Sequence, residues 1–228
     1  EDPYTMPMRI APTCHFTMGG LWSDYDLQTS IPGLFVGGEC AWNYHGANRL
    51  GANSLLSASV DGWFTLPYSV PGYLAGRLGA PEPPSDDDEV VASAVRRARE
   101  RVEALLSVGG STGPEHFHRE LGEVLYSGCG VTRSAAGLTE AIGRVRDLRA
   151  RFWSELRVTG SSDHLNPVLE YAGRVADFLE LAELMCVDAL DRDESCGAHF
   201  RTEHQSRGGE ALRDDDTWCF ASAWGSCG

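Results

Sequence analysis

The stretch between His45 and Leu56 concentrates polar side chains and glycines that could hold a ligand. It places a histidine, an arginine and two asparagines around two glycines and runs directly into an apolar pattern with helical spacing. The first N–H groups of a helix lack intrahelical partners and the helix dipole is positive there, so such a loop suits an anion or a dipole. Asn53 or Ser54 is the expected cap of this helix.

Two segments before this stretch carry strand and turn signals. Residues 17–22 and 33–38 are expected strands, with a turn near residues 23–26. The Gly37-Gly38-Glu39 end of the second strand would let the backbone approach a ligand and adds one carboxylate. In doubly wound sheets, ligands bind at this end of the strands. Without further context, the same residues are a plain turn after a strand.

Helical periodicity organises the rest of the chain. A first helix is expected from about Asn53 to Leu66, where Pro67 should stop it, and the proline- and glycine-rich residues 67–84 are an expected linker. Apolar residues then recur with a 3.6-residue period in four segments, two of which begin near Pro114 and Pro167. Residues 85–191 therefore predict an up-and-down helical bundle. Residues 192–228 are polar, glycine-rich and largely aperiodic.

Composition excludes several classes of protein. The 228 residues are 42% hydrophobic and 23% charged, which allows a sizeable core, and the net charge is −14. Such an acidic chain disfavours nucleic acid and direct binding to anionic lipid. Seven scattered cysteines with no C-x-x-C pair predict a reduced, intracellular protein without a metal site of its own. No apolar run approaches the ~20 residues of a membrane span.

Three motifs in sequence order resemble signatures of the succinate dehydrogenase/fumarate reductase flavoprotein subunits. They are Thr-Cys-His-Phe-Thr-Met-Gly-Gly at 13–20, Pro-Gly-Leu-Phe-Val-Gly-Gly-Glu at 32–39 and the stretch at 45–56. Residues 194–201 resemble the family's C-terminal signature, with Cys196 where many members have arginine. The resemblance implies an α+β chain. Residues 1–66 would be the C-terminal part of a capping and FAD-binding α/β region. Residues 67–84 would be a linker, and residues 85–191 would form an antiparallel helical bundle. Residues 192–228 would be the irregular start of a C-terminal domain.

The resemblance implies a dicarboxylate substrate, succinate or fumarate, held by Arg49 and His15. Both substrates are dianions, and an arginine offers a permanent charge with a planar, bidentate fork. A histidine donates hydrogen bonds and changes charge near neutral pH. Taken alone, His15 would more often be a packed histidine and Arg49 a surface or capping arginine. The motif context favours the substrate-binding roles.

The resemblance also implies FAD as the cofactor that accepts or donates the hydride. Glu39 matches the acidic residue that contacts the ribityl chain. Ser54 and Leu55 match positions whose backbone N–H groups face the pyrimidine edge of the flavin, where a helix dipole would stabilise the reduced form. His45 is expected to support this loop or lie near the cofactor.

Further expectations follow from what the motifs leave out. The glycine-rich FAD fingerprint and the arginine that acts as proton shuttle are expected upstream, so this chain is expected to be a fragment that is inactive alone. An iron–sulfur subunit would take the electrons and a membrane anchor subunit would hold the complex. The flavoprotein would be peripheral, on the cytoplasmic side of the membrane in bacteria.

Two alternatives remain open from the sequence. An L-aspartate oxidase-like flavoenzyme shares the His-Gly-Ala-Asn-Arg-Leu run, but its usual continuation is Ala-Ser-Asn-Ser-Leu-Leu-Glu, whereas Gly51 and Ala52 open the continuation here. A non-catalytic helical interaction module would need only residues 85–191. Such a module would not explain why the chain carries the motifs around His15, Glu39 and Arg49.

Overall fold

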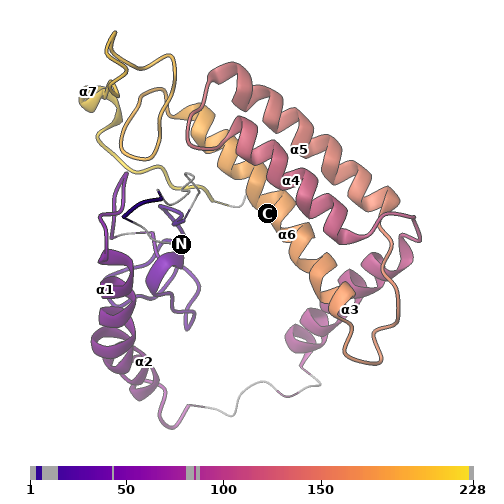
Figure 1. Ribbon diagram of the computed structural model, residues 1–228. Coiled ribbons are helices and arrows are strands. Elements are labelled where there is room, and N and C mark those ends of the chain that lie inside the picture. The colour runs from indigo at the N-terminus through magenta and orange to yellow at the C-terminus, as the bar shows by residue number, and fades with distance from the viewer. Residues whose placement is uncertain (1–3, 7–14, 43, 81–84, 86–87, 226–228) are drawn as a thin grey trace. The chain divides into compact units, whose positions relative to one another are not determined.

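The computed structural model describes residues 4–6, 15–42, 44–80, 85 and 88–225 and divides the chain into two compact units, Glu1–Gly76 and Arg77–Gly228 (Figure 1). The first unit joins irregular chain with isolated β-bridges to a helical segment. The second is a helical bundle followed by an irregular C-terminal segment. This is the predicted fold class, with less regular strand than expected.

The two strands expected at residues 17–22 and 33–38 are not regular strands. The described part of the first unit pairs there only through isolated bridges, parallel at Leu21–Ala41 and antiparallel at Ser23–Thr29 and Gln28–Phe35. The chain reverses tightly around Asp24, whose Oδ1 accepts hydrogen bonds from the amides of Asp26 and Gln28, at 2.9 Å each. This turn leaves each pairing segment too short to propagate a ladder.

A continuous helical segment follows the third motif: α1 (Asn53–Val60), a π-helical turn η2 (Asp61–Thr65) and α2 (Leu66–Ala75). The prediction that the helix stops at Pro67 is wrong. Proline lacks the N–H that a regular helix needs and its ring clashes with the preceding turn. The π turn widens the helix just before Pro67, with the Leu66 N–H donating to the Asp61 carbonyl, and so accommodates the ring.

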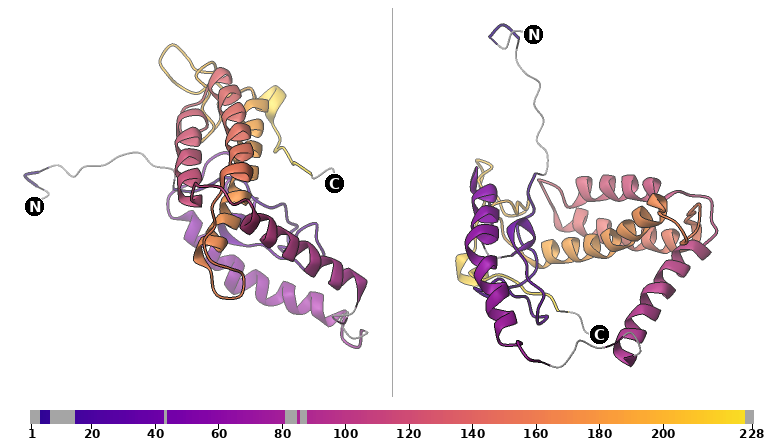
Figure 2. Two further views of the ribbon diagram at one scale, coloured as in Figure 1. Left: turned by 90° about the vertical axis from the view of Figure 1, so that its right-hand side faces the viewer. Right: turned by 90° about the horizontal axis from the view of Figure 1, so that it is seen from below.

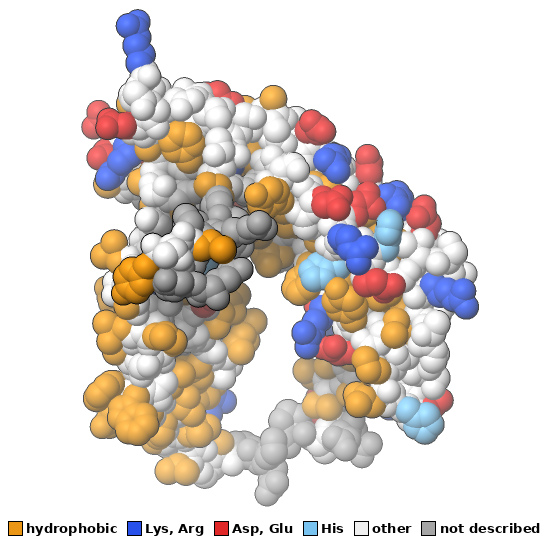
Figure 3. Space-filling view, in the orientation of Figure 1, with side chains coloured by type: hydrophobic (Ala, Val, Ile, Leu, Met, Phe, Trp, Pro, Cys, Tyr) orange, Lys and Arg blue, Asp and Glu red, His pale blue; other side chains and the backbone are white. Residues whose placement is uncertain are grey.

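This helical segment presents apolar side chains on its surface. Leu56, Val60, Trp63 and Phe64 are exposed and line a shallow hollow along α1 and η2. Figure 3 shows hydrophobic side chains gathered over this part of the first unit. Several of these residues formed the apolar pattern that predicted the helix, and here that pattern marks a surface.

Three helices of the second unit pack side by side into a bundle: α4 (Pro114–Gly128), α5 (Ala135–Glu155) and α6 (Pro167–Asp191) (Figure 2). Their inward faces form one apolar core, and at its centre the rings of Phe117 and Phe152 meet edge to face with centroids 5.3 Å apart. Pro114 and Pro167 open their helices as the sequence predicts. Within the described residues, no helix is both long and apolar enough to cross a membrane.

Helix α3 (Glu89–Ser107) departs from the predicted up-and-down bundle. Asp88 is its N-cap, since the Asp88 side chain accepts a hydrogen bond from the Val90 amide. However, Leu105 is its only buried residue, and most of its length is exposed. The apolar stripe that predicted this helix is rich in alanine and valine, which offer little area to bury compared with the leucines and phenylalanines of α4 and α5.

The irregular segment after α6 is fastened to the end of that helix by a buried arginine. The Arg201 guanidinium donates to the carbonyl oxygens of Ala189, Leu190 and Arg192 at 3.3–3.4 Å. The last carbonyls of a helix lack intrahelical donors, and a cation there also complements the dipole. The segment also contains a short helix, α7 (Asp215–Trp218).

Replacing Glu183 by glutamine tests the ionic contact between α6 and α5. Glu183 is paired with Arg146 and Arg149, each with a nitrogen–oxygen distance of 2.6 Å. The hydrogen bond from Arg146, with the charge of Arg149, lowers the pKa of Glu183. A lowered pKa contributes stability above the ordinary pKa of about 4.3 and loses it as the pH falls through the folded-state value.

We therefore expect Glu183→Gln to lower the free energy of unfolding by about 1 kcal/mol at neutral pH and by much less in acid. Urea unfolding followed by circular dichroism at both pH values measures this. Glu180→Gln, an exposed position on the same helix, is the matched control. An equal loss at both pH values would contradict the ionic origin.

Candidate flavin and dicarboxylate site

The ring of Phe16 brings the first and third motifs together. His45 packs against it edge to face with ring centroids 5.0 Å apart, and the Arg49 guanidinium carbon lies 4.9 Å from its centroid. A cation over an aromatic face is attracted by the negative charge of that face. His15, the other residue predicted to bind substrate, precedes Phe16 in the chain and is exposed.

Within the part of the chain that the structure describes, the hydrogen-bond donors of the Arg49 guanidinium are only partly satisfied. Its Nη1 donates to the carbonyl of Leu50 at 3.3 Å. Its Nε is buried and, among the described residues, has no hydrogen-bond partner. A buried charged donor without a partner costs stability unless something else pairs with it. Arg49 is therefore an arginine with donors to spare for an anion.

Glu39 ties the second motif to the first. It lies in the short 3₁₀ helix η1 (Gly38–Cys40), and its Oε1 accepts from the Thr17 amide at 2.9 Å. Beside it, the Leu21 amide donates to the Cys40 carbonyl at 2.8 Å. The carboxylate of Glu39 is exposed, and its second oxygen keeps its capacity to accept a hydroxyl.

The start of α1 has no side-chain cap. Asn53 and Ser54 do not cap it, contrary to the prediction, because both are already helical and the N-cap position is Ala52 in the left-handed region (φ 67°). The N–H groups of the first turn, which include those of Ser54 and Leu55, are therefore not covered by a capping side chain. Leu55 is 78% exposed.

A buried carboxylate that was not singled out from the sequence holds these segments together. Asp61 is 2% exposed, and its two oxygens accept from the Gly38 amide and the Tyr44 hydroxyl, each at 2.7 Å. Gly38 has φ 68°, and an added Cβ would press on Ala58 at 3.3 Å. A lone acid inside an apolar helical run was the available signal, since such an acid is rarely buried without partners.

The Asp61–Tyr44 contact also fixes the protonation of the tyrosine. Burial is the largest cause that raises the pKa of Tyr44, and its hydrogen bond to Asp61 and the negative charge of that carboxylate raise it further. Tyr44 is therefore a neutral hydroxyl donor throughout the physiological range. Its neighbour His45 lies with Nε2 3.5 Å from the Ser57 hydroxyl, which places His45 against α1.

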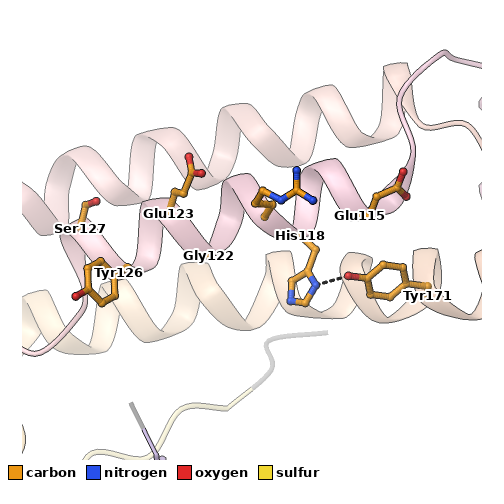
Figure 4. Close-up of a pocket in the computed structure, with 8 residues that line it drawn as sticks. Glu115, His118, Gly122, Glu123, Tyr126, Ser127 and Tyr171 are labelled. Carbon is orange, nitrogen blue, oxygen red and sulfur yellow. Dashed lines mark hydrogen bonds between the residues drawn. The ribbon is translucent and has the colours of Figure 1, made fainter. Parts of the chain in front are cut away.

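The second unit has a separate groove of about 520 Å³ along α4 (Figure 4). His118 and Tyr171 meet there through a hydrogen bond between Nδ1 and the hydroxyl. The Nε2 of His116 lies 3.7 Å from a carboxylate oxygen of Glu120 on the same helix, so the two histidines have different partners. Among the described residues, no group of three His, Cys, Asp or Glu side chains could hold a metal ion. None of the predicted site residues lies in this groove.

Two family models match the chain, one in each unit. The model described as "FAD binding domain" matches residues 1–55, and the model described as "Fumarate reductase flavoprotein C-term" matches residues 118–227. The first covers the three motifs around His15, Glu39 and Arg49. The second covers the bundle and the irregular segment after it.

Named relatives agree with these matches. The succinate dehydrogenase flavoprotein subunit of Bacillus subtilis is 34% identical over 96% of this chain and 36% of its own length. The fumarate reductase flavoprotein subunit of Escherichia coli is 33% identical over 94% of this chain and 34% of its own. In solved structures, E. coli quinol fumarate reductase gives a TM-score of 0.80 at 30% identity, covering 96% of this chain and 35% of that one.

The chain belongs to the family of succinate dehydrogenase and fumarate reductase flavoprotein subunits. It spans about a third of the length of the relatives it matches. A Mycobacterium smegmatis structure, Sdh1 in complex with UQ1, has a TM-score of 0.71 at 32% identity and covers 86% of this chain and 31% of that one. Family membership thus rests on both units.

Replacing Asp61 by alanine tests whether this carboxylate holds the site together. The substitution leaves the buried Gly38 amide without its acceptor, so we expect a loss of about 1–3 kcal/mol in the free energy of local opening. Hydrogen exchange of the Gly38 amide measures it directly, by an increase of roughly 10- to 100-fold in exchange rate. Asp26→Ala, at an exposed turn, is the control, and unchanged exchange in Asp61→Ala would refute the role.

Proposed function

We propose that the full-length protein containing this chain interconverts succinate and fumarate, with FAD as the hydride carrier. The observation that carries the proposal is the arrangement around Phe16. Arg49 and His45 pack on its ring, His15 precedes Phe16 in the chain, and Glu39 accepts a hydrogen bond from the amide of Thr17, which follows it. Three motifs distant in sequence thereby surround one place, next to the uncapped start of α1.

Arg49 and His15 are the proposed substrate ligands. A dicarboxylate needs a donor at each end, and the guanidinium of Arg49 can offer a bidentate fork to one carboxylate. Its Nε supports this role, because binding an anion would satisfy a donor that the described residues leave without a partner. The packing against Phe16 holds the arginine in place before substrate arrives and so reduces the entropy lost on binding.

The residues of the second and third motifs fit a flavin. Glu39 would accept a ribityl hydroxyl through the oxygen not used by the Thr17 amide. The first-turn N–H groups at Ser54 and Leu55 would face the pyrimidine edge, where the positive helix end favours negative charge. When bound, FAD supplies the acceptor and donor of the hydride. His45, between Phe16 and Ser57, would keep the loop in register with α1.

The relatives' names describe subunits, and the proposal extends this to partners. We infer an iron–sulfur subunit that takes electrons from FAD and a membrane anchor subunit that holds the complex on the cytoplasmic side of the membrane. The acidic chain, with its net charge of −14, favours attachment through protein contacts over direct attachment to anionic lipid. The arginine that shuttles the proton is proposed to lie in the remainder of the flavoprotein.

Substituting Arg49 in the full-length protein tests the proposed clamp. Two hydrogen bonds to a charged group contribute roughly 3–6 kcal/mol, so Arg49→Gln should lower kcat/KM for succinate about 100-fold or more. Arg49→Lys keeps the charge but loses the fork, and should recover only part of the activity. Succinate-dependent reduction of an artificial acceptor dye measures both.

Flavin content, measured by its absorbance per protein, separates substrate binding from a general loss of the site. It should stay near the unsubstituted value in both Arg49 variants. Arg96→Gln, on the exposed face of α3, is the matched control and should leave kcat/KM unchanged. Full activity in Arg49→Gln would contradict the proposal, and activity with L-aspartate in place of succinate would favour the oxidase alternative.

A further inference from the structure

His199 lies where three parts of the helical unit meet. It belongs to the irregular segment after α6, and its ring contacts both the end of α6 and the loop between α4 and α5. Its Nδ1 lies 2.8 Å from Nη1 of Arg133 in that loop. Its Nε2 lies 2.9 Å from the carbonyl oxygen of Arg192, the residue that follows α6. One partly buried side chain therefore ties the segment to two helical parts.

These two partners fix the protonation state of the ring. A guanidinium can only donate hydrogen bonds, so the Nδ1 that faces Arg133 must accept and carries no proton. A carbonyl can only accept, so the Nε2 that faces Arg192 must donate. The ring is therefore the neutral tautomer with its proton on Nε2. A second proton would have to enter at Nδ1, against the Arg133 guanidinium, and would replace a hydrogen bond by repulsion between two cations.

The charges around His199 also oppose its protonation. Three arginines act on the ring: Arg133 from the loop before α5, Arg192 from the end of α6 and Arg201 from the irregular segment. Burial is the largest cause that lowers the pKa of His199, and the three positive charges lower it further against the opposing effect of the hydrogen bond to the Arg192 carbonyl. The neutral ring therefore suits its surroundings and the charged ring does not.

The carboxylates in this region are engaged with other cations. Three of them pair with two of the arginines, Glu194 with Arg192 at 2.6 Å, and Asp193 and Glu203 with Arg201 at 3.3 Å each. Asp193 also lies 2.8 Å from His204. Cys196 meets His199 through backbone hydrogen bonds of 2.8 and 3.0 Å. Among the described residues, no carboxylate forms an ion pair with His199 itself, so a proton on its ring would have no counter-charge of its own.

The residues next to His199 attach the irregular segment to the start of α5. The Arg133 amide donates to the Phe200 carbonyl at 2.9 Å, and the Thr202 amide donates to the Arg133 carbonyl at 2.8 Å. The Glu203 carboxylate accepts from the amide of the first residue of α5 at 2.7 Å. Because Arg133 takes part in two of these bonds, repulsion between its guanidinium and a charged His199 would act directly on this attachment.

We propose that His199 is a pH-sensitive latch, which holds residues 199–203 against the start of α5 while its ring is neutral and loosens them when the ring takes up a proton. In the loosening step, Nδ1 gains a proton from solvent and loses its hydrogen bond from Arg133, and the imidazolium is repelled by the surrounding arginines. None of the residues of the latch belongs to the proposed FAD and dicarboxylate site, and the proposal does not depend on that assignment.

The sign of the pH dependence follows from the lowered pKa. Between the pKa values of the closed and open forms, the open form binds more protons. The latch should therefore contribute its full stability above the ordinary histidine pKa of about 6.5 and lose it as the pH falls below that value.

Hydrogen exchange of the full-length protein, followed by mass spectrometry of peptic peptides, tests the proposal. Protection factors, which correct for the intrinsic effect of pH on exchange, are compared at about pH 7.5 and about pH 5.5, on either side of the ordinary histidine pKa. Protection of residues 199–203 should fall in acid by up to about tenfold, since the lower pH is about one unit below that pKa. Protection of residues 138–148, within α5, should change little.

Substitutions separate the titration of His199 from its packing. In His199→Gln the side chain keeps one acceptor and one donor but cannot become charged, so protection of residues 199–203 should be nearly the same at both pH values. His116→Gln, at an exposed histidine on α4, is the matched control and should keep the wild-type fall. In Arg133→Gln the fall should become smaller, because a charge that opposes protonation of the ring is gone.

Three results would overturn the proposal. The first is equal protection of residues 199–203 at both pH values in the wild-type protein, and the second is a fall that occurs only together with the whole bundle. The third is a fall in His199→Gln as large as in the wild type. If that variant loosens the segment already at neutral pH, Arg133→Gln decides, since an undiminished fall in acid there would contradict the latch.

Discussion

The first unit depends on one buried carboxylate. Asp61, in the π turn after α1, accepts from the Gly38 amide and the Tyr44 hydroxyl and so joins three segments that share little other regular pairing. Each anchor stands next to a proposed site residue: Glu39 follows Gly38, and His45 follows Tyr44. Two hydrogen bonds to a buried charge are strong and directional. They can therefore fix a ligand loop in a unit whose described β-structure is limited to isolated bridges.

The second unit is stabilised mainly by apolar packing. Helices α4, α5 and α6 are held by a contiguous apolar core. Polar contacts add to it, both between helices, as Glu183 does with Arg146 and Arg149, and at a helix end, as Arg201 does at the end of α6. Such a bundle has its stability spread over many contacts.

Sequence periodicity predicted the bundle well and the site only in part. The leucine- and phenylalanine-rich faces and the prolines at 114 and 167 located α4, α5 and α6, since burial and the fixed φ of proline act locally. The continuation of the helix past Pro67 was not predicted. The π turn that accommodates the proline ring depends on how the neighbouring turns adjust together, and no local sequence signal shows this. The partners of Asp61 were also missed, since Gly38 and Tyr44 are distant in sequence. The roles of His15, Glu39 and Arg49 came from motif resemblance. Physical reasoning alone favoured a packed histidine, a plain turn after a strand and a surface or capping arginine.

The central claim is that this arrangement binds a dicarboxylate against a flavin in the full-length protein. The most direct measurement is the absorbance spectrum of that protein, oxidised and without oxygen, as succinate is added. The account predicts that the flavin absorbance bleaches and that fumarate appears in step with it. A protein that carries no flavin, or whose flavin stays oxidised with succinate and bleaches only with L-aspartate, would contradict it.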